Sequence, residues 1–161
     1  FEHGELYSAD SIHFADSFKY YTLRKHRVVY GGGGIMPDVF VPLDTTQYTK
    51  FLRQMAARSY IINANLKYID VNRKQLKKQF ATFNDFNARF EVPQSLIDDV
   101  VQAAEKDKIK PKDQQELQAT LPQLRRQLKA LIARDLWDMS EYFQVINETN
   151  PIVVKAVGLL K

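Results

Sequence analysis

Apolar positions follow two different patterns along the chain. Within residues 18–42 they alternate with polar positions or form short β-branched runs, as in strands. From about residue 45 they recur every three or four residues, as on one face of a helix. The pattern predicts an α+β fold that is mostly α. Short N-terminal β-strands are expected within residues 1–44, and a C-terminal helical bundle within residues 45–161.

The first part contains three candidate strands. Phe18, Tyr20 and Thr22 fall on one face of the first strand. Val28-Val29-Tyr30 and Val39-Phe40-Val41 have the β-branched and aromatic composition of two more. Residues 1–17 are rich in turn formers, so we expect a loop with at most one short strand. Because a few short strands rarely make a stable sheet alone, we expect these to complete a larger sheet or to pair with another copy.

The second part begins with the longest helical stripe. The apolar spacing over residues 48–69 predicts one long helix, or two in succession, up to about Asp70. Asp44 or Thr45 can cap its start, with Gln47 in the position of a capping box. A further helix is expected to end near Phe80, before an aromatic-rich loop at residues 82–87.

Helical spacing continues to the end of the chain. Pro93 suits the first turn of a helix. Asp113 is expected to open another helix, which Pro122 interrupts or restarts. A stripe of apolar residues then runs over residues 124–146, and Asn150-Pro151 is expected to cap a last short helix.

Four consecutive glycines, at positions 31–34, follow the second candidate strand. Glycine adopts φ > 0 and lets other backbone approach closely. Pro37 fixes its own φ and favours an extended Met36. We expect a structural turn, in which Asp38 accepts backbone N–H bonds and Arg27 pairs with Asp38 or with another carboxylate. A phosphate-binding loop is disfavoured, because neither G-x-G-x-x-G nor G-x-x-x-x-G-K-[ST] is present.

This region resembles the stretch downstream of the active site in C-terminal-processing (tail-specific) serine peptidases. That family's pattern runs aromatic, Thr-Pro-x-Gly-Arg, a short strand, Gly-Gly-Ile-x-Pro-Asp and a further strand. Tyr20-Tyr21-Thr22 fits its opening, Arg27 fits the arginine, and Gly33-Gly34-Ile35-Met36-Pro37-Asp38 fits its end. Leu23 stands where proline is usual and His26 where glycine is usual, so the turn before Arg27 is expected to be built differently. The matching residues all lie between Tyr20 and Val39.

The resemblance implies that the matching residues have a structural role. Members of the family use a serine nucleophile activated by a lysine, in a Gly-Ser-x-Ser turn and a Gly-Lys-Gly-like strand upstream of this region. Neither motif is present, and no serine or lysine of the chain is next to a glycine. We therefore expect no catalytic residue here. The turn that would support the peptidase core consists of Arg27, Gly33, Gly34, Pro37 and Asp38.

The resemblance also implies that the chain is part of a longer protein, a tail-specific peptidase. Such a peptidase hydrolyses peptide bonds near the C-termini of proteins, usually in the bacterial periplasm or cell envelope, with a PDZ domain that helps to select tails. Residues 1–44 would be the end of its core sheet, and residues 45–161 a helical domain for assembly or for covering the substrate cleft. The expected partners are the catalytic and PDZ domains and protein or peptide substrates, and homo-oligomerisation is left open.

The composition of the chain excludes several classes of protein. Hydrophobic residues make up 45% of the 161 residues, which is in the globular range, and no apolar run is long enough for a transmembrane helix. The absence of cysteine excludes disulfides, thiolate metal sites and a cysteine nucleophile. The chain starts with Phe1 and without a signal-peptide pattern, so we expect its start to be a processing, proteolysis or cloning boundary.

Two other kinds of site are less favoured. His3, His13 and His26 could bind zinc with nearby carboxylates, but they are more typical of surface or turn histidines, and we expect neither a metal nor a cofactor. The net charge of +4 suggests a second hypothesis, a standalone helical interaction or nucleic-acid-binding module. Its candidate cations and stacking groups are Arg73, Lys74, Lys77, Lys78, Arg125, Arg126, Lys129, Phe80, Phe83 and Phe86. The phenylalanines and Trp137 lie where a bundle needs core, so we expect packing instead, and no nucleic acid as partner.

Overall fold

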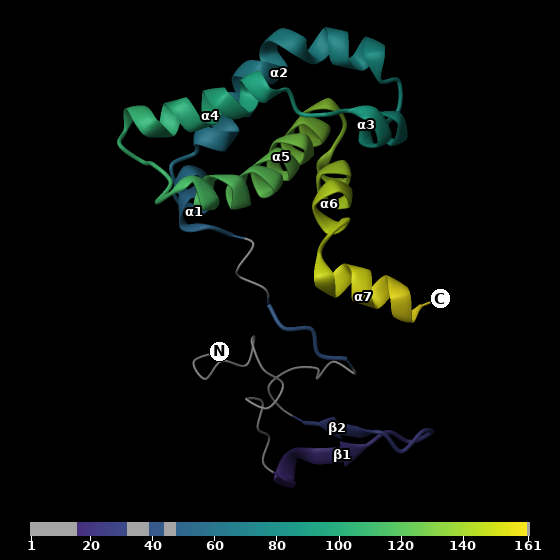
Figure 1. The fold of residues 1–161 in the computed structure, drawn as a ribbon. Coiled ribbons are helices and arrows are strands. Elements are labelled where there is room, and N and C mark those ends of the chain that lie inside the picture. Colours follow the sequence, from purple (N-terminus) through teal and green to yellow (C-terminus); the bar gives the residue numbers. More distant parts are fainter. Residues whose placement is uncertain (1–15, 32–38, 44–47, 161) are drawn as a thin grey trace. The chain divides into compact units, whose positions relative to one another are not determined.

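The computed structural model describes residues 16–31, 39–43 and 48–160. The chain divides into two compact units, Phe1–Asp44 and Thr45–Lys161. The first unit contains a 3-10 turn and two short strands, and the second contains seven helices among its described residues (Figure 1). The predicted α+β, mostly α fold is therefore confirmed.

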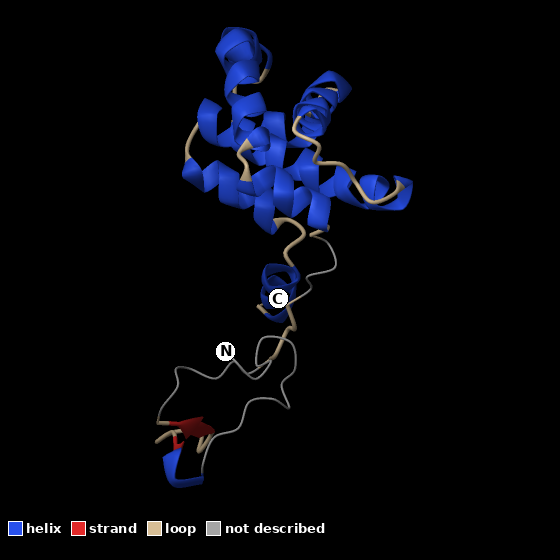
Figure 2. Ribbon diagram, turned by 90° about the vertical axis from the view of Figure 1, so that its left-hand side faces the viewer, coloured by secondary structure: helices blue, strands red, loops and turns tan. Residues whose placement is uncertain are grey.

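The first unit contains an antiparallel hairpin (Figure 2). A 3-10 turn, Asp16–Phe18, leads into β1 (Lys19–Tyr21), which pairs with β2 (Val28–Tyr30). Lys19 lies opposite Tyr30, and Tyr21 lies opposite Val28. Thr22 and Arg27 are bonded across the loop between the strands: the Thr22 N–H donates to the Arg27 carbonyl at 2.9 Å, and the Arg27 N–H donates to Thr22 Oγ1 at 3.0 Å.

The prediction of a third strand at Val39–Val41 is wrong for the described residues. Residues 39–43 have no strand pairing. Apolar, β-branched composition favours an extended backbone, but a strand forms only where a neighbouring edge supplies its hydrogen bonds. The predicted loop at residues 1–17 lies almost wholly outside the described residues, as does the glycine turn from position 32 to position 38.

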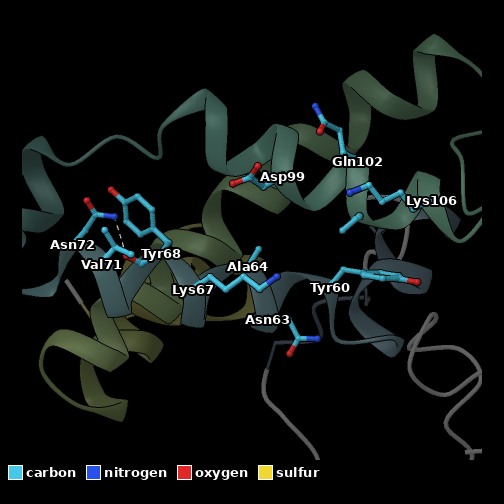
Figure 3. A pocket seen from close by; sticks show the side chains of 11 residues that line it. Tyr60, Asn63, Ala64, Lys67, Tyr68, Val71, Asn72, Asp99, Gln102 and Lys106 are labelled. Carbon is cyan, nitrogen blue, oxygen red and sulfur yellow. Dashed lines mark hydrogen bonds between the residues drawn. The ribbon is translucent and has the colours of Figure 1, made fainter.

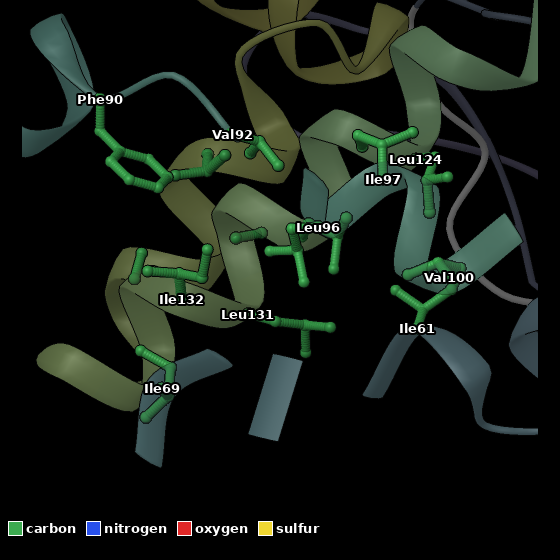
Figure 4. Close-up of a cluster of buried hydrophobic side chains, with 14 of the residues drawn as sticks. Ile61, Ile69, Phe90, Val92, Leu96, Ile97, Val100, Leu124, Leu131 and Ile132 are labelled. Carbon is green, nitrogen blue, oxygen red and sulfur yellow. The ribbon is translucent and has the colours of Figure 1, made fainter. Parts of the chain in front are cut away.

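The second unit is a bundle in which five helices contact one another. Its elements are α1 (Lys50–Ala57), α2 (Tyr60–Gln79), α3 (Phe83–Arg89), α4 (Gln94–Lys106), α5 (Gln114–Leu136), α6 (Met139–Asn147) and α7 (Pro151–Leu159). Helix α5 is central, because it packs against α1, α2, α4 and α6. Figure 4 shows apolar side chains of α2, α4, α5 and the Phe90–Val92 segment converging on one core.

Polar side chains begin most of these helices. Thr49, Thr82, Asp113, Asp138 and Asn150 each accept a hydrogen bond from a backbone N–H of the following first turn, at 2.6 to 3.3 Å. Such caps satisfy N–H groups that have no partner inside the helix. The predicted cap at Asn150-Pro151 is confirmed.

The predicted boundaries differ from the structure at both ends of the first helical segment. Helix α1 begins at Lys50 with Thr49 as its cap, so the expected start at Asp44 or Thr45 is wrong. The alternative of two helices in succession is confirmed, and α2 continues to Gln79. The aromatic-rich loop predicted at residues 82–87 is instead helix α3, because Thr82 caps it and Phe86 is drawn into the core.

Two further predictions about the last long helices need correction. Helix α5 runs through Pro122 without a break. The proline is exposed, so the carbonyl that loses its N–H partner can bind water. Conversely, the apolar stripe over residues 124–146 is divided between α5 and α6, because Asp138 accepts a bond from its neighbour's N–H and begins a new helix there.

Two helix junctions use a left-handed residue other than glycine. Ser59 separates α1 from α2 with φ 62°, and Lys108 follows α4 with φ 62°. After Lys108, the Ile109 N–H donates to the Ala104 carbonyl at 3.0 Å and the Ile109 side chain is buried. This is a Schellman ending, which turns the chain sharply towards α5.

Within the described ranges, the structure has no helix that is both long enough and apolar enough to cross a membrane.

Candidate functional site

The structure describes one of the five residues predicted for the supporting turn. Arg27 lies directly before β2 and is exposed, and its backbone closes the hairpin loop with Thr22. The other four residues, Gly33, Gly34, Pro37 and Asp38, lie outside the described residues. The predicted pairing of Arg27 with Asp38 therefore stays a prediction.

The hairpin carries apolar side chains on an exposed surface. Phe18, Tyr20, Tyr21, Val28 and Val29 are each at least two-fifths exposed, between 42% and 61%. Aromatic and β-branched side chains of strands normally pack against a neighbouring layer. In the described part of this unit no such layer is present. The hairpin therefore has the residue composition of a sheet that packs against another layer, while its apolar side chains are exposed.

The second unit has a groove between α2 and α4 of about 510 Å³. Figure 3 shows its side chains, with Ala64 and Lys67 on α2 and Asp99 and Lys106 on α4. The lining residues include no serine, cysteine or histidine. The groove therefore holds neither a serine or cysteine nucleophile nor a histidine base.

Two tyrosines of this groove remain protonated donors at neutral pH. The hydroxyl of Tyr60 donates to the Asp107 carboxylate, and this bond raises the pKa of Tyr60. Burial raises the pKa of Tyr68. Neither phenol is activated as a base.

A second groove, of about 460 Å³, lies where the Phe90–Val92 segment approaches α5 and α6. We call it the arginine groove. Its apolar lining is Phe90, Val92, Pro122 and Val145, its cations are Arg125, Arg126 and Lys129, and its carboxylates are Glu91 and Glu148. Three of the apolar residues, Phe90, Val92 and Val145, belong to the buried core.

The three cations of the arginine groove are held by neutral acceptors. Arg125 donates to the Val92 carbonyl at 3.1 Å and to the Gln94 side chain. Arg126 donates to Gln123 Oε1 at 3.0 Å, and Lys129 donates to the backbone carbonyl of Asn87 at 2.6 Å. These residues are half-buried rather than fully solvated. These candidate cations of the nucleic-acid hypothesis are thus partly built into the fold.

A third feature is the carboxylate of Glu116, which lies on α5 and caps the start of α1. Its two oxygens accept the Phe51 N–H of α1 at 3.0 Å and the Lys112 N–H at 2.7 Å. Both bonds lower the pKa of Glu116, and the bond from the Lys112 N–H has the larger effect. A hydroxyl pair, Thr49 with Thr120 at 2.6 Å, ties the same two helices together. The site is structural, since the first-turn N–H groups that could hold an anion are already bound.

A polar pair, of which only Asn65 is buried, joins α2 and α5 where they cross. Asn65 is fully buried, and its Nδ2 donates to Asp135 Oδ2 at 2.6 Å. Arg134 donates from Nε to the other carboxylate oxygen at 2.9 Å. Asn65 Oδ1 has no hydrogen-bond partner. Sequence reasoning missed this pair, because Asn65 occupies a core position of a stripe that otherwise reads as apolar.

The candidate stacking aromatics are part of the core. Phe80 and Phe86 are buried, and the Phe86 ring stacks on Phe90 with ring centroids 4.5 Å apart. Phe83 and Phe86 both pack against Trp137, at 5.9 and 5.3 Å between centroids. The prediction that these residues serve packing is confirmed, and they do not form an exposed stacking platform.

The described part of the chain contains no group of three or more His, Asp or Glu side chains arranged to hold a metal ion. Of the three histidines, only His26 is described. It lies in the hairpin loop with φ 46°, and its N–H donates to the Thr22 carbonyl at 3.1 Å. His26 is therefore a turn residue in the structure.

The last helix, α7, is apolar and contributes no buried residue. Its exposed side chains include Ile152, Val154, Val157 and Leu159, and Leu160 follows at 87% exposure. An exposed apolar helix of this kind is typical of a surface that another segment or protein covers.

Comparison with known proteins identifies a family and no individual relative. No curated protein matches the chain, and no solved structure matches it. A family model described as "Family of unknown function (DUF8443)" matches residues 51–138, from the first turn of α1 to the cap of α6. Since this match covers more than half of the sequence, the chain belongs to the family of unknown function DUF8443.

Proposed function

We propose that the chain is the non-catalytic C-terminal region of a tail-specific serine peptidase. The sequence resemblance between Tyr20 and Val39 supports this function. The observation that carries it is the hairpin: among the described residues, β1 and β2 pair only with each other and expose apolar side chains. An isolated two-stranded hairpin is marginally stable in water, so these strands fit the end of a larger sheet.

Each unit has a separate task in this proposal. Arg27 and the Gly33–Asp38 turn support the core sheet of the enzyme, whose serine and lysine come from outside this chain. The helical unit takes part in assembly or covers the substrate cleft, and its α2–α4 groove and α7 are the surfaces available for such contacts. The whole enzyme would act in the periplasm or cell envelope, together with a PDZ domain.

The test begins with the reading frame that precedes the chain in its gene. The proposal predicts a Gly-Ser-x-Ser motif and a lysine strand there. The longer protein should cleave a peptide with a free C-terminus, and replacing the upstream serine or lysine should abolish cleavage. The 161-residue chain alone should have no activity.

Two results would overturn the proposal. One is a preceding reading frame without the serine and the lysine. The other is peptide cleavage by the 161-residue chain itself, because this chain has none of the family's catalytic motifs. A variant such as Lys25→Gln, at the exposed tip of the hairpin loop, is a suitable control for the longer enzyme and should cleave normally.

The exposed apolar surface of α7 favours a second candidate, a helical interaction module. A nucleic-acid-binding module is supported less well, because Arg125 and Lys129 are bonded to backbone carbonyls and the aromatics are buried. Light scattering of the 161-residue chain tests self-association. Salt-sensitive binding of an oligonucleotide that weakens when Arg125, Arg126 and Lys129 are reversed in charge would favour nucleic acid instead.

A further inference from the structure

Four lysines share one small cleft of the helical unit, where the loop between α4 and α5 approaches the start of α1 (Figure 1). We call it the lysine cleft. Its volume is about 280 Å³, and its lining consists of Lys50, Gln54, Lys108, Ile109, Lys110, Lys112 and Glu116. Like charges that line one cleft repel one another, so the fold holds together a group of cations that would otherwise separate.

The backbone of the α4–α5 loop brings three of these lysines to the cleft. Pro111 favours an extended backbone at Lys110, and residues two apart in an extended segment point to the same side. Lys110 and Lys112 therefore share a side, opposite the half-buried Pro111. Lys108 lies in the left-handed turn before the buried Ile109 and lines the cleft with them.

Hydrogen bonds hold both ends of this loop. The Ile109 N–H donates to the Ala104 carbonyl at 3.0 Å, and the Lys112 N–H donates to the Glu116 carboxylate at 2.7 Å. Between these bonds, the ring of Pro111 restricts the backbone. The lysines are therefore carried on a fixed backbone, which lowers the entropic cost of bringing several ammonium groups to one ligand.

The charge of the cleft is unbalanced. Glu116 is the one carboxylate among its lining residues, and its oxygens accept backbone N–H groups. The nearby Asp107 and Asp113 do not line the cleft, because Asp107 accepts the Tyr60 hydroxyl and Asp113 accepts the N–H of Glu116 at 2.8 Å. In the part of the chain that the structure describes, none of the four lysines forms an ion pair. Four ammonium groups and one carboxylate leave a formal charge of +3.

These features select the kind of anion. A single carboxylate would leave most of the charge unmatched, whereas a phosphomonoester or pyrophosphate carries more than one negative charge at neutral pH. Lysine binds phosphate as a point charge. No aromatic side chain lines the cleft, so the bases of a nucleic acid would have nothing to stack on. The volume of about 280 Å³ lies just below the usual range for small-ligand sites, about 300–1,000 Å³, so the ligand must be compact.

We propose that the lysine cleft binds a compact, multiply charged phosphate group, such as pyrophosphate or a phosphomonoester. The ammonium groups are its donors, because the first-turn N–H of Phe51 is already bound to Glu116. A soluble phosphate and a phosphomonoester lipid headgroup present the same chemistry to the cleft. The site lies wholly within the helical unit, so it does not depend on the peptidase function proposed above.

The first test is isothermal titration calorimetry of the 161-residue chain with pyrophosphate at constant ionic strength. The unaltered protein should show saturable binding with one site per chain. Replacing Lys110 and Lys112 together by glutamine should weaken binding at least about tenfold, because charge-assisted bonds are lost. The matched control replaces Lys74 and Lys77 by glutamine, which removes the same charge from exposed positions on α2 and should leave the affinity unchanged. Thermal unfolding shows that each variant is folded.

A variant with the opposite effect locates the ligand beside Glu116. Glu116→Gln removes the negative charge of the cleft and keeps an amide oxygen that can accept an N–H bond. It should therefore bind pyrophosphate about threefold more tightly, or better. Glu141→Gln removes one carboxylate from α6 and should leave the affinity unchanged, because Glu141 does not line the cleft.

Vesicles distinguish the two sources of phosphate. The chain is sedimented with phosphatidylcholine vesicles that either contain or lack phosphatidic acid. Binding only to the vesicles with phosphatidic acid, and release by pyrophosphate, would assign the cleft to a lipid headgroup. Pyrophosphate binding without vesicle binding would assign it to a soluble phosphate. Either result supports the phosphate site.

Several outcomes would overturn the inference. The absence of pyrophosphate binding would remove the site. Equal losses in the two double variants would mean that only net charge matters, and an unchanged or weaker affinity in a folded Glu116→Gln variant would place the anion elsewhere. Displacement of pyrophosphate by single-stranded DNA, at a lower phosphate concentration than unlabelled pyrophosphate requires, would assign the cleft to nucleic acid instead.

Discussion

Replacement of Glu116 by alanine tests how α1 is joined to α5. The carboxylate accepts the Phe51 and Lys112 N–H groups, at 3.0 and 2.7 Å. Loss of a capping acceptor costs about 0.5–2 kcal/mol, typically about 1, for each helix start affected. Two bonds are lost together, so Glu116→Ala should lower the free energy of unfolding by about 2 kcal/mol.

Neighbouring cations should add to this effect at low salt. Lys50, Lys108, Lys110 and Lys112 line the small cleft beside Glu116. Without the Glu116 carboxylate, these four lysines lose the one negative charge that lines the cleft with them. The loss of stability should therefore be greater at low than at high ionic strength, because salt screens exposed charges.

The matched control is Glu141→Ala. Glu141 is the third residue of α6, as Glu116 is the third residue of α5, so both are near the positive end of a helix dipole. Glu141 accepts a bond from the Ser140 hydroxyl and caps no other helix. Urea unfolding followed by circular dichroism at 222 nm should show a cost of about 0.5 kcal/mol or less for this variant. Equal costs for the two variants would refute the bridging role of Glu116.

The pH dependence gives an independent check. The pKa of Glu116 is lowered from 4.5, first by the Lys112 N–H and then by the Phe51 N–H. A lowered folded-state pKa means that the stabilisation is complete above about pH 4.5 and is lost as pH falls through the folded value. The stability advantage of the wild type over Glu116→Gln should therefore shrink below pH 4.5. An advantage that stays constant down to pH 2.5 would contradict the assignment.

Three further predictions concern stability and use the same unfolding assay. Lys108→Gly should stabilise the protein by about 0.5–1 kcal/mol, because glycine adopts the φ of 62° without the Cβ penalty; a loss of stability would contradict the Schellman ending. Pro122→Ala should stabilise by about 1–3 kcal/mol, since it restores a backbone donor inside α5, and no gain would mean that the helix is already relaxed around the proline. Asn65→Asp should destabilise by about 3 kcal/mol or more at pH 7, because it buries a second carboxylate against Asp135, and the deficit should decrease at acidic pH.

The helices could be predicted where the signal is local. The repeat of three and four residues shows the apolar face of α2, α4 and α5, and Asn150-Pro151 marks the start of α7. The errors come from signals that compete within a few residues. Thr82 and Phe86 favour a helix within a stretch whose asparagines favour a loop, and the burial of Phe86 decides for the helix.

The candidate sites depended on contacts that a linear pattern does not contain. Glu116 and Phe51 are 65 residues apart, and Lys129 and Asn87 are 42 apart. The sequence identified Arg125, Arg126 and Lys129 as a basic cluster. It did not show that the Phe90–Val92 segment lies beside them, and this proximity is what changes a basic cluster into a groove with an apolar wall.

The two units differ in how completely their apolar side chains and backbone N–H groups find partners within the same unit. This difference bears on function. In the helical unit, α1, α2 and α4 bury their apolar faces against α5, and the Phe51 N–H in the first turn of α1 is capped by Glu116 of α5. The family match covers this self-sufficient part. The hairpin instead exposes aromatic side chains on strands too short to be stable alone. A unit such as the hairpin is expected to fold as part of something larger. A unit such as the helical bundle can be present as a separate binding domain. The two units therefore call for different experiments, one on the enzyme to which the strands would belong and one on the helical unit by itself.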